Sequence, residues 1–152
     1  EELGLEKRFH KVAQRPGKPF WFGYSAALGE SNKGGNINRD KKTIVFGFPG
    51  NPISTFVNCL AYFYPWYYKS VGLEVKEETA ILAEGINFKP NLAYFLQVKL
   101  ASENGKLMAY PITGNGSGDL ASLVKADAFI QLPSDKIEFK KGEVYPILKY
   151  RE

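Results

Sequence analysis

The sequence predicts an α/β unit followed by a small all-β module of the sandwich or barrel type. Residues 43–48 form an apolar, β-branched segment that runs through a Gly/Pro turn straight into a helical pattern, a connection typical of α/β folds. After Gly72 the pattern changes to short strands separated by turn signals. We therefore predict an α/β domain at residues 1–73 and a β domain at residues 74–152.

Three strands are predicted before the helix, each rich in aromatic or β-branched residues. They cover residues 6–13, 20–25 and 43–48, and the last of them is expected to be buried. The polar, Gly- and Asn-rich segment 26–42 is predicted to be a hairpin tip or a loop, and the sequence gives no function for it.

A helix is predicted from Pro52 to about Val71. Asn51 is a favoured N-cap, and Pro52 fits the first helical position because its missing N–H is not needed there. Pro65 is expected to kink the helix because it cannot donate to the carbonyl of residue 61. Gly72 is expected to end it.

The second half of the chain reads as short strands with tight turns. The pair Asn104-Gly105 is a strong signal for a two-residue hairpin, and Gly142 marks another turn. One short helix is expected at residues 119–125. The predicted strands are residues 80–84, 94–100, 106–111, 128–132 and 143–148.

Composition excludes several classes of protein. The chain has 20 Lys and Arg against 16 Asp and Glu, so its net charge is +4, without the basic stripe of a nucleic-acid binder. No apolar run is long enough to span a membrane. The single cysteine, Cys59, reads as a core thiol, and His10 lacks the partners of a metal site. The chain opens at Glu1 without Met, so we expect an internal part of a longer cytoplasmic protein.

Three segments could hold an anion, although each also has a simpler explanation. Pro49-Gly50-Asn51 directs a helix N-terminus beyond the strand, but capping explains the same residues. Arg15 and Lys18 lie on a turn stiffened by two prolines, which would also suit a solvated surface. The glycines around Ser117 could present backbone N–H groups, or could form a flexible connection between strands.

The order of these motifs resembles the molybdopterin molybdotransferase (MoeA) family, which includes the gephyrin E domain. The segment Phe46-Gly47-Phe48-Pro49-Gly50-Asn51-Pro52-Ile53-Ser54 is the specific part of the resemblance. Supporting segments cover nearly the whole chain: Pro16-Gly17-Lys18-Pro19, Phe22-Gly23, Gly116-Ser117-Gly118, residues 120–123 and 126–133, and Lys141-Gly142-Glu143.

The resemblance implies the C-terminal part of a transferase of molybdenum cofactor biosynthesis. Residues 1–73 would be the second half of a MoaB-like three-layer α/β domain that binds molybdopterin. The family inserts molybdenum from molybdate into adenylylated molybdopterin with Mg²⁺ and acts as a homodimer. The Mg²⁺ ligands are expected upstream of Glu1, so no metal ligand is expected here and the fragment alone should be inactive. The sequence does not distinguish molybdenum from tungsten.

The resemblance also implies roles for particular residues. Lys18 would be a catalytic basic residue of the cleft, and Ser117 a catalytic serine at the molybdate site. The binding residues would be Arg15, where the family usually has lysine, together with Pro49, Gly50, Asn51, Ser54, Gln97, Gly116 and Gly118.

Two family arginines are replaced, by Leu92 and Gln97, which weakens the expectation of a charged molybdate site there. A non-catalytic relative that binds molybdopterin, or that serves as a dimerisation or scaffold module, is therefore an alternative. A general nucleotide-binding domain with a β appendage is a third.

Overall fold

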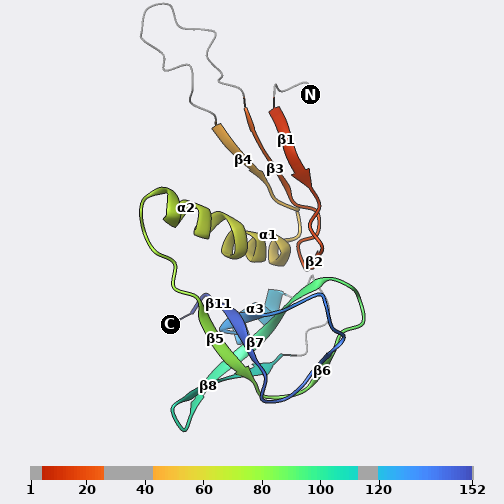
Figure 1. The fold of residues 1–152 in the computed structure, drawn as a ribbon, viewed down its shortest axis with the longest axis vertical. Coiled ribbons are helices and arrows are strands. Elements are labelled where there is room, and N and C mark those ends of the chain that lie inside the picture. The colour runs from red at the N-terminus through yellow and green to blue at the C-terminus, as the bar shows by residue number, and fades with distance from the viewer. Residues whose placement is uncertain (1–4, 26–42, 113–119, 152) are drawn as a thin grey trace, which may run out of the picture.

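The computed structural model describes residues 5–25, 43–112 and 120–151, and it has three parts (Figure 1). A three-stranded sheet lies on one side of a long helical segment, and a β-barrel lies on the other. The predicted loop 26–42 falls outside the described residues.

The small sheet is antiparallel, in the order β1 (Leu5–His10), β3 (Trp21–Ser25) and β4 (Thr43–Gly47). The prediction that residues 43–48 are buried is wrong, because Thr43 and Ile44 are exposed and the rest only half-buried. The reason is that β4 lies at the edge of this sheet and packs on the helix through Phe46, whose ring is 5.2 Å from that of Trp66. One sheet and one helical layer are described, so the three-layer arrangement stays a prediction.

The helix is continuous but changes its winding. It consists of α1 (Pro52–Asn58), a π-helical turn η1 (Cys59–Phe63) and α2 (Tyr64–Ser70). The π turn ends at Phe63, two residues before Pro65, where we expected a kink. A widened turn gives room for a proline ring that would otherwise crowd the carbonyl four residues back. Gly72, at φ +79°, ends the helix as predicted.

The third part is a closed five-stranded barrel, which decides between the predicted sandwich and barrel architectures. Its strands are β5 (Glu78–Leu82), β7 (Ala93–Glu103), β8 (Lys106–Pro111), β9 (Ala128–Leu132) and β11 (Val144–Lys149). They pair in the order β7-β8-β5-β11-β9, and β9 pairs with β7 again. Asn104 and Gly105 both have positive φ, which confirms the predicted hairpin.

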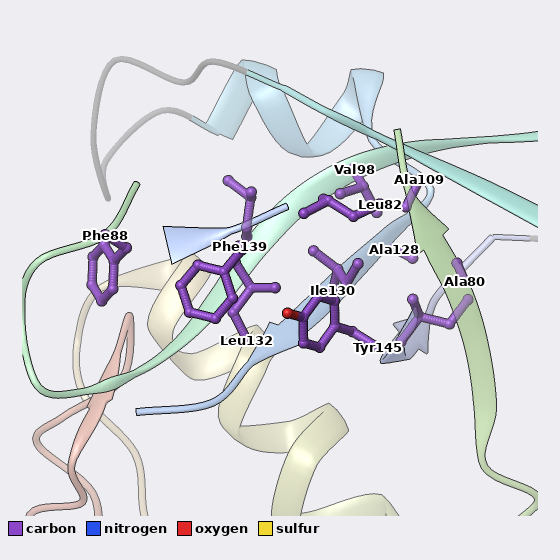
Figure 2. Close-up of a cluster of buried hydrophobic side chains, with 12 residues drawn as sticks. Ala80, Leu82, Phe88, Val98, Ala109, Ala128, Ile130, Leu132, Phe139 and Tyr145 are labelled. Atoms are coloured by element: carbon purple, nitrogen blue, oxygen red, sulfur yellow. The ribbon is translucent and has the colours of Figure 1, made fainter. Parts of the chain in front are cut away.

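The barrel interior is the main hydrophobic core (Figure 2). Alternate residues of each strand point inward, as a barrel requires. The buried side chains of this cluster are Ala80, Leu82, Phe88, Leu96, Val98, Ala109, Ala128, Ile130, Leu132, Phe139, Tyr145 and Ile147.

Three two-residue strands were not predicted, because they are too short to carry a hydrophobic pattern. They are β2 (Gln14–Arg15), β6 (Ile86–Asn87) and β10 (Glu138–Phe139). The strand β2 matters most, since it runs parallel to β7 and so adds a segment of the first predicted domain to the sheet of the second.

Helix α1 also packs directly on the barrel. Ile53 and Val57 lie in one buried cluster with Phe95 and Phe129, and the ring of Phe56 is 5.0 Å from that of Tyr150. Helix and barrel therefore share a core, and the division at residues 73 and 74 stays a prediction.

Candidate functional site

The Arg15–Pro19 turn lies between β2 and β3, beside helix α1. Its backbone is fixed by hydrogen bonds from the N–H groups of Val12 and Phe20 to the carbonyl of Lys18, at 3.0 and 2.9 Å. The Arg15–Pro16 peptide bond is cis, and Gly17 has φ +94°. Gly17 is buried, whereas the side chains of Arg15 and Lys18 are exposed. The turn thus presents two cations from a tightly held backbone.

A cleft of about 110 Å³ brings Arg15 and Gln97 together. Arg15 reaches it because β2 pairs with β7, which places Arg15 opposite Tyr94. Burial raises the pKa of Tyr94, which also lines the cleft, while the charge of Arg15 acts to lower it. The positive charge of Arg15 is therefore felt inside the cleft. Ile53 of α1, Phe95, Phe129 and Ser122 complete much of the lining.

Gln97 contributes a buried polar atom to the lining of the cleft. Its Oε1 atom is buried, and no described residue donates a hydrogen bond to it. A buried amide oxygen without a donor is unfavourable by about 1–3 kcal/mol, so a donor supplied by a ligand or a water molecule would be favoured here. Leu92, the other replaced position, packs against the barrel core and is not among the residues that line the cleft.

The segment from Pro49 to Ser54 forms a capped helix start. The Oδ1 atom of Asn51 accepts a hydrogen bond from the N–H of Ser54 at 3.0 Å, which confirms Asn51 as the N-cap. The hydroxyl of Thr55 donates to the carbonyl of Pro49. Gly50 is exposed, and a Cβ atom added there would meet no described atom within 4 Å, whereas Ser54 is buried. Ile53 lines the cleft, so this helix start is adjacent to it.

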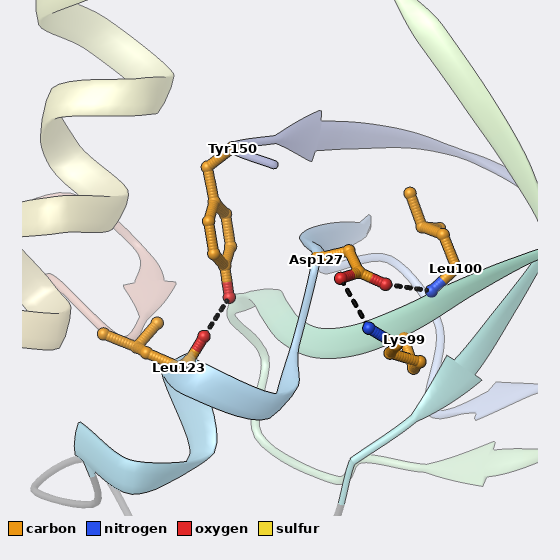
Figure 3. Close-up of polar contacts among 5 residues, drawn as sticks. All are labelled: Lys99, Leu100, Leu123, Asp127 and Tyr150. Carbon is orange, nitrogen blue, oxygen red and sulfur yellow. Dashed lines mark hydrogen bonds and ion pairs between the residues drawn. The ribbon is translucent and has the colours of Figure 1, made fainter. Parts of the chain in front are cut away.

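Gly116, Ser117 and Gly118 lie outside the described residues. The helix that follows them, α3 (Leu120–Lys125), is attached to the barrel at its end (Figure 3). The hydroxyl of Tyr150 donates to the carbonyl of Leu123 at 3.2 Å, and burial raises the pKa of Tyr150 to about 12.

Asp127 fixes the chain just after α3. Its carboxylate accepts hydrogen bonds from Lys99 Nζ at 2.8 Å and from the N–H of Leu100 at 2.9 Å (Figure 3). Burial acts to raise the pKa of Asp127, but these two bonds and the charge of Lys99 outweigh it and lower the pKa. The carboxylate is therefore engaged in structure.

Sequence reasoning missed a buried polar cluster under the Arg15–Pro19 turn. It consists of the buried Gln14 and Asn58, which bond each other and the backbone of the turn, and of the half-buried Tyr62, which donates to Gln14. The signal was present in the sequence, because Asn58 interrupts the apolar stripe of a helix.

The remaining candidates have structural explanations. His10 is exposed on β1, and Cys59 is only half-buried rather than a core thiol; burial raises its pKa. In residues 5–25, 43–112 and 120–151, no group of three or more His, Cys, Asp or Glu could hold a metal ion. No helix in that part of the chain is long and apolar enough to cross a membrane.

The aromatic stripe at residues 62–68 divides between core and surface. The ring of Tyr62 stacks on that of Phe20 at 4.9 Å, while Tyr64, Tyr67 and Tyr68 are exposed. A hollow of about 440 Å³ lies between α2 and the barrel, with Tyr64, Tyr68 and Leu148 among its lining residues.

Comparisons with known proteins agree with this arrangement. Residues 79–150 match the MoeA C-terminal region (domain IV). A molybdopterin molybdenumtransferase of Synechocystis is 35% identical over 146 residues, which are 95% of this chain and 32% of that protein. The enzyme of the same name from Bacillus subtilis is 27% identical over 157 residues, covering 100% of this chain and 33% of that protein.

Solved structures give the same result. A crystal structure of the molybdopterin biosynthesis MoeA protein from Pyrococcus horikoshii OT3 aligns with a TM-score of 0.69 and 26% identity, over 99% of this chain and 34% of that one. The chain spans about a third of the length of the curated relatives it matches. The chain therefore resembles the C-terminal part of MoeA proteins over nearly its whole length, and residues 79–150 match the MoeA C-terminal region.

Proposed function

We propose that this chain is the C-terminal part of a molybdopterin molybdotransferase, which inserts molybdenum from molybdate into adenylylated molybdopterin. The observation that carries the proposal is the cleft in which Arg15 meets Gln97 beside the start of α1, in a chain related to proteins named molybdopterin molybdenumtransferase. Residues 1–73 would form the second half of a MoaB-like three-layer α/β domain, and residues 74–152 the C-terminal β domain.

The residues would hold an oxyanion next to the pterin dithiolene. Arg15 and Lys18 supply positive charge from one turn, and Gln97, which lines the same cleft as Arg15, would donate a hydrogen bond to the oxyanion from its Nε2 group. Charge placed where negative charge develops stabilises the transition state as the phosphoanhydride breaks and AMP leaves. Gly116, Ser117 and Gly118 would add donors to the molybdate, while Pro49, Gly50, Asn51 and Ser54 would face the pterin phosphate.

The Mg²⁺ that the reaction uses does not fit the described residues, which hold no group of three or more potential ligands from His, Cys, Asp and Glu. We assign its ligands to other parts of the full-length protein, and the roles proposed for Arg15, Lys18 and Gln97 do not depend on the metal. The fragment alone is then expected to be inactive.

We also propose that the full-length protein is a cytoplasmic homodimer. The exposed side chains of Tyr64, Tyr67 and Tyr68 in α2, and of Val71 just after it, support an interface along this helix, since large aromatic side chains are enriched at such surfaces.

A second candidate is a non-catalytic relative that binds molybdopterin or serves as a dimerisation or scaffold module. The observation in its favour is the pair Leu92 and Gln97, which stand where the family usually has arginine. Leu92 packs on the barrel core and Gln97 carries no charge, so Arg15 is the cationic side chain among the described residues that line the cleft, and Lys18 lies on the same turn outside that lining.

Reconstituted molybdenum insertion by the full-length protein tests the two candidates. Lys18→Ala should lower the rate by at least about tenfold, because one charged donor at the reacting centre is lost. Lys106→Ala, an exposed lysine at the β7–β8 hairpin, is the matched control and should leave the rate unchanged. An undiminished rate in Lys18→Ala would remove Lys18 from the site, and a wild-type protein without insertion activity would favour the scaffold.

Molybdate affinity of Gln97→Arg tests the cleft itself. If Gln97 faces the oxyanion, an added positive charge should tighten molybdate binding, measured by calorimetry on the full-length protein. An unchanged affinity would place residue 97 outside the anion site.

A further inference from the structure

Two buried side-chain amides connect the Arg15–Pro19 turn to helix α1. Gln14 is 2% exposed and Asn58 is 0% exposed. Gln14 Nε2 donates to Asn58 Oδ1 at 2.8 Å and to the carbonyl of Pro16 at 2.9 Å. Asn58 Nδ2 donates to the carbonyl of Gly17 at 3.2 Å, and the hydroxyl of Tyr62 donates to Gln14 Oε1. Each amide therefore uses both its oxygen and its nitrogen.

The direction of these bonds indicates what the cluster does. Burying an amide is unfavourable unless its hydrogen bonds are made, so an aliphatic side chain would fill the same space at lower risk. Here Gln14 and Asn58 each direct a donor to a backbone carbonyl of the turn, at residues 16 and 17. The cluster thus fixes the position of that backbone relative to α1, in addition to filling the core.

Gly17 shows how closely the turn approaches these amides. A Cβ atom at residue 17 would lie 2.6 Å from Asn58 Oδ1 and 2.6 Å from Gln14 Nε2. A glycine is needed for this approach, and its φ of +94° suits glycine as well. The turn is therefore held against α1 on both sides of residue 17.

The two cations depend on this backbone for their placement. Arg15 and Lys18 flank Pro16 and Gly17, and both are exposed. Neither takes part in the three ion pairs found within the described part of the chain. Long cationic side chains without such restraints are positioned mainly by where their backbone lies.

We propose that Gln14 and Asn58 are positioning residues, which hold the Arg15–Pro19 turn where its two cations bind an oxyanion together. This inference rests on the proposed function, because it takes molybdate as the anion of that turn. The two amides would not contact the anion themselves and would act on its binding through the position of the turn.

Molybdate binding to the full-length protein, measured by calorimetry with inorganic molybdate, tests the proposal. Asn58→Leu keeps the side-chain size and removes every hydrogen bond, and it should weaken molybdate binding roughly 10- to 100-fold through misplacement of the turn. Gln14→Met is a second variant with the same expectation, in case one of the two fails to fold. Val57→Ala removes packing at the neighbouring buried position and should keep the wild-type affinity.

A double-mutant cycle separates positioning from general damage. In a Lys18→Ala background, Asn58→Leu should cause a further loss well below that in the wild type, because the cation it positions is already gone. Equal losses in both backgrounds, or an equal loss in Val57→Ala, would overturn the inference. If Lys18→Ala itself left molybdate affinity unchanged, the proposed anion site would fail first, which is a distinguishable result.

Discussion

Replacing Gly17 by alanine should destabilise the fold more than the same change at Gly72 or Gly50, two turn glycines with open space around them. The new Cβ would lie 2.6 Å from both Asn58 Oδ1 and Gln14 Nε2, so these buried amides would have to move apart. A left-handed backbone angle costs an L-residue about 1–2 kcal/mol. A buried amide left without its partner adds about 1–3 kcal/mol. We therefore expect a loss of about 2–5 kcal/mol in the free energy of unfolding.

The two other glycines separate these contributions. Gly72 has φ +79° but open space around it, so Gly72→Ala should show the backbone cost alone, about 1–2 kcal/mol. Gly50 has open space and no such angle, so Gly50→Ala should be neutral or stabilising by about 0.4–1 kcal/mol. Urea unfolding followed by circular dichroism measures all three. If Gly17→Ala were no less stable than Gly72→Ala, the contact with the amides would not explain the glycine.

Two further predictions concern the barrel. Three hydrogen bonds lower the pKa of Glu143 to about 2. The bond from Lys136 has the largest effect, and the bonds from Tyr145 and from the N–H of Lys140 add to it. This pKa lies below the ordinary value of 4.5, so the ionised Glu143 stabilises the folded state. The stabilisation should be complete above about pH 4.5 and lost as the pH falls toward 2. The melting temperature of Glu143→Gln should therefore fall less steeply over that range, and an identical slope would contradict the assignment. Leu82→Ala should cost about 2–5 kcal/mol in urea unfolding, because the side chain is fully buried. Val124→Ala, at a side chain that is 67% exposed, should change stability by less than about 0.5 kcal/mol, and equal effects would contradict the assigned core.

Local signals predicted most of the elements. The hairpin at Asn104 and Gly105, the cap at Asn51 and the helix end at Gly72 each depend on the chemistry of one or two residues, and all three are confirmed. The burial of residues 43–48 was predicted wrongly, because an apolar pattern does not say whether a strand is central or at a sheet edge. Pairing partners, which decide that, lie far apart in the sequence.

In the candidate site, too, single residues could be selected from the sequence, but their spatial arrangement could not. Arg15 and Gln97 could each be selected from the sequence, but their meeting in one cleft depends on the parallel pairing of β2 with β7. A two-residue strand has no periodicity from which such a pairing could be predicted. The cluster of Gln14, Asn58 and Tyr62 was missed because a polar residue shows its partner only after the chain has folded.

The sequence by itself determined the order of the elements, their turns and caps, and the motifs that resemble the MoeA family, since these depend on neighbouring residues. Only the tertiary structure decided that the β module is a closed barrel, that α1 packs on it, and that a buried amide cluster holds the turn of Arg15 and Lys18. The physical reason is that barrel closure and buried hydrogen bonds join residues distant in the chain, and their energies exist only once both partners are in place.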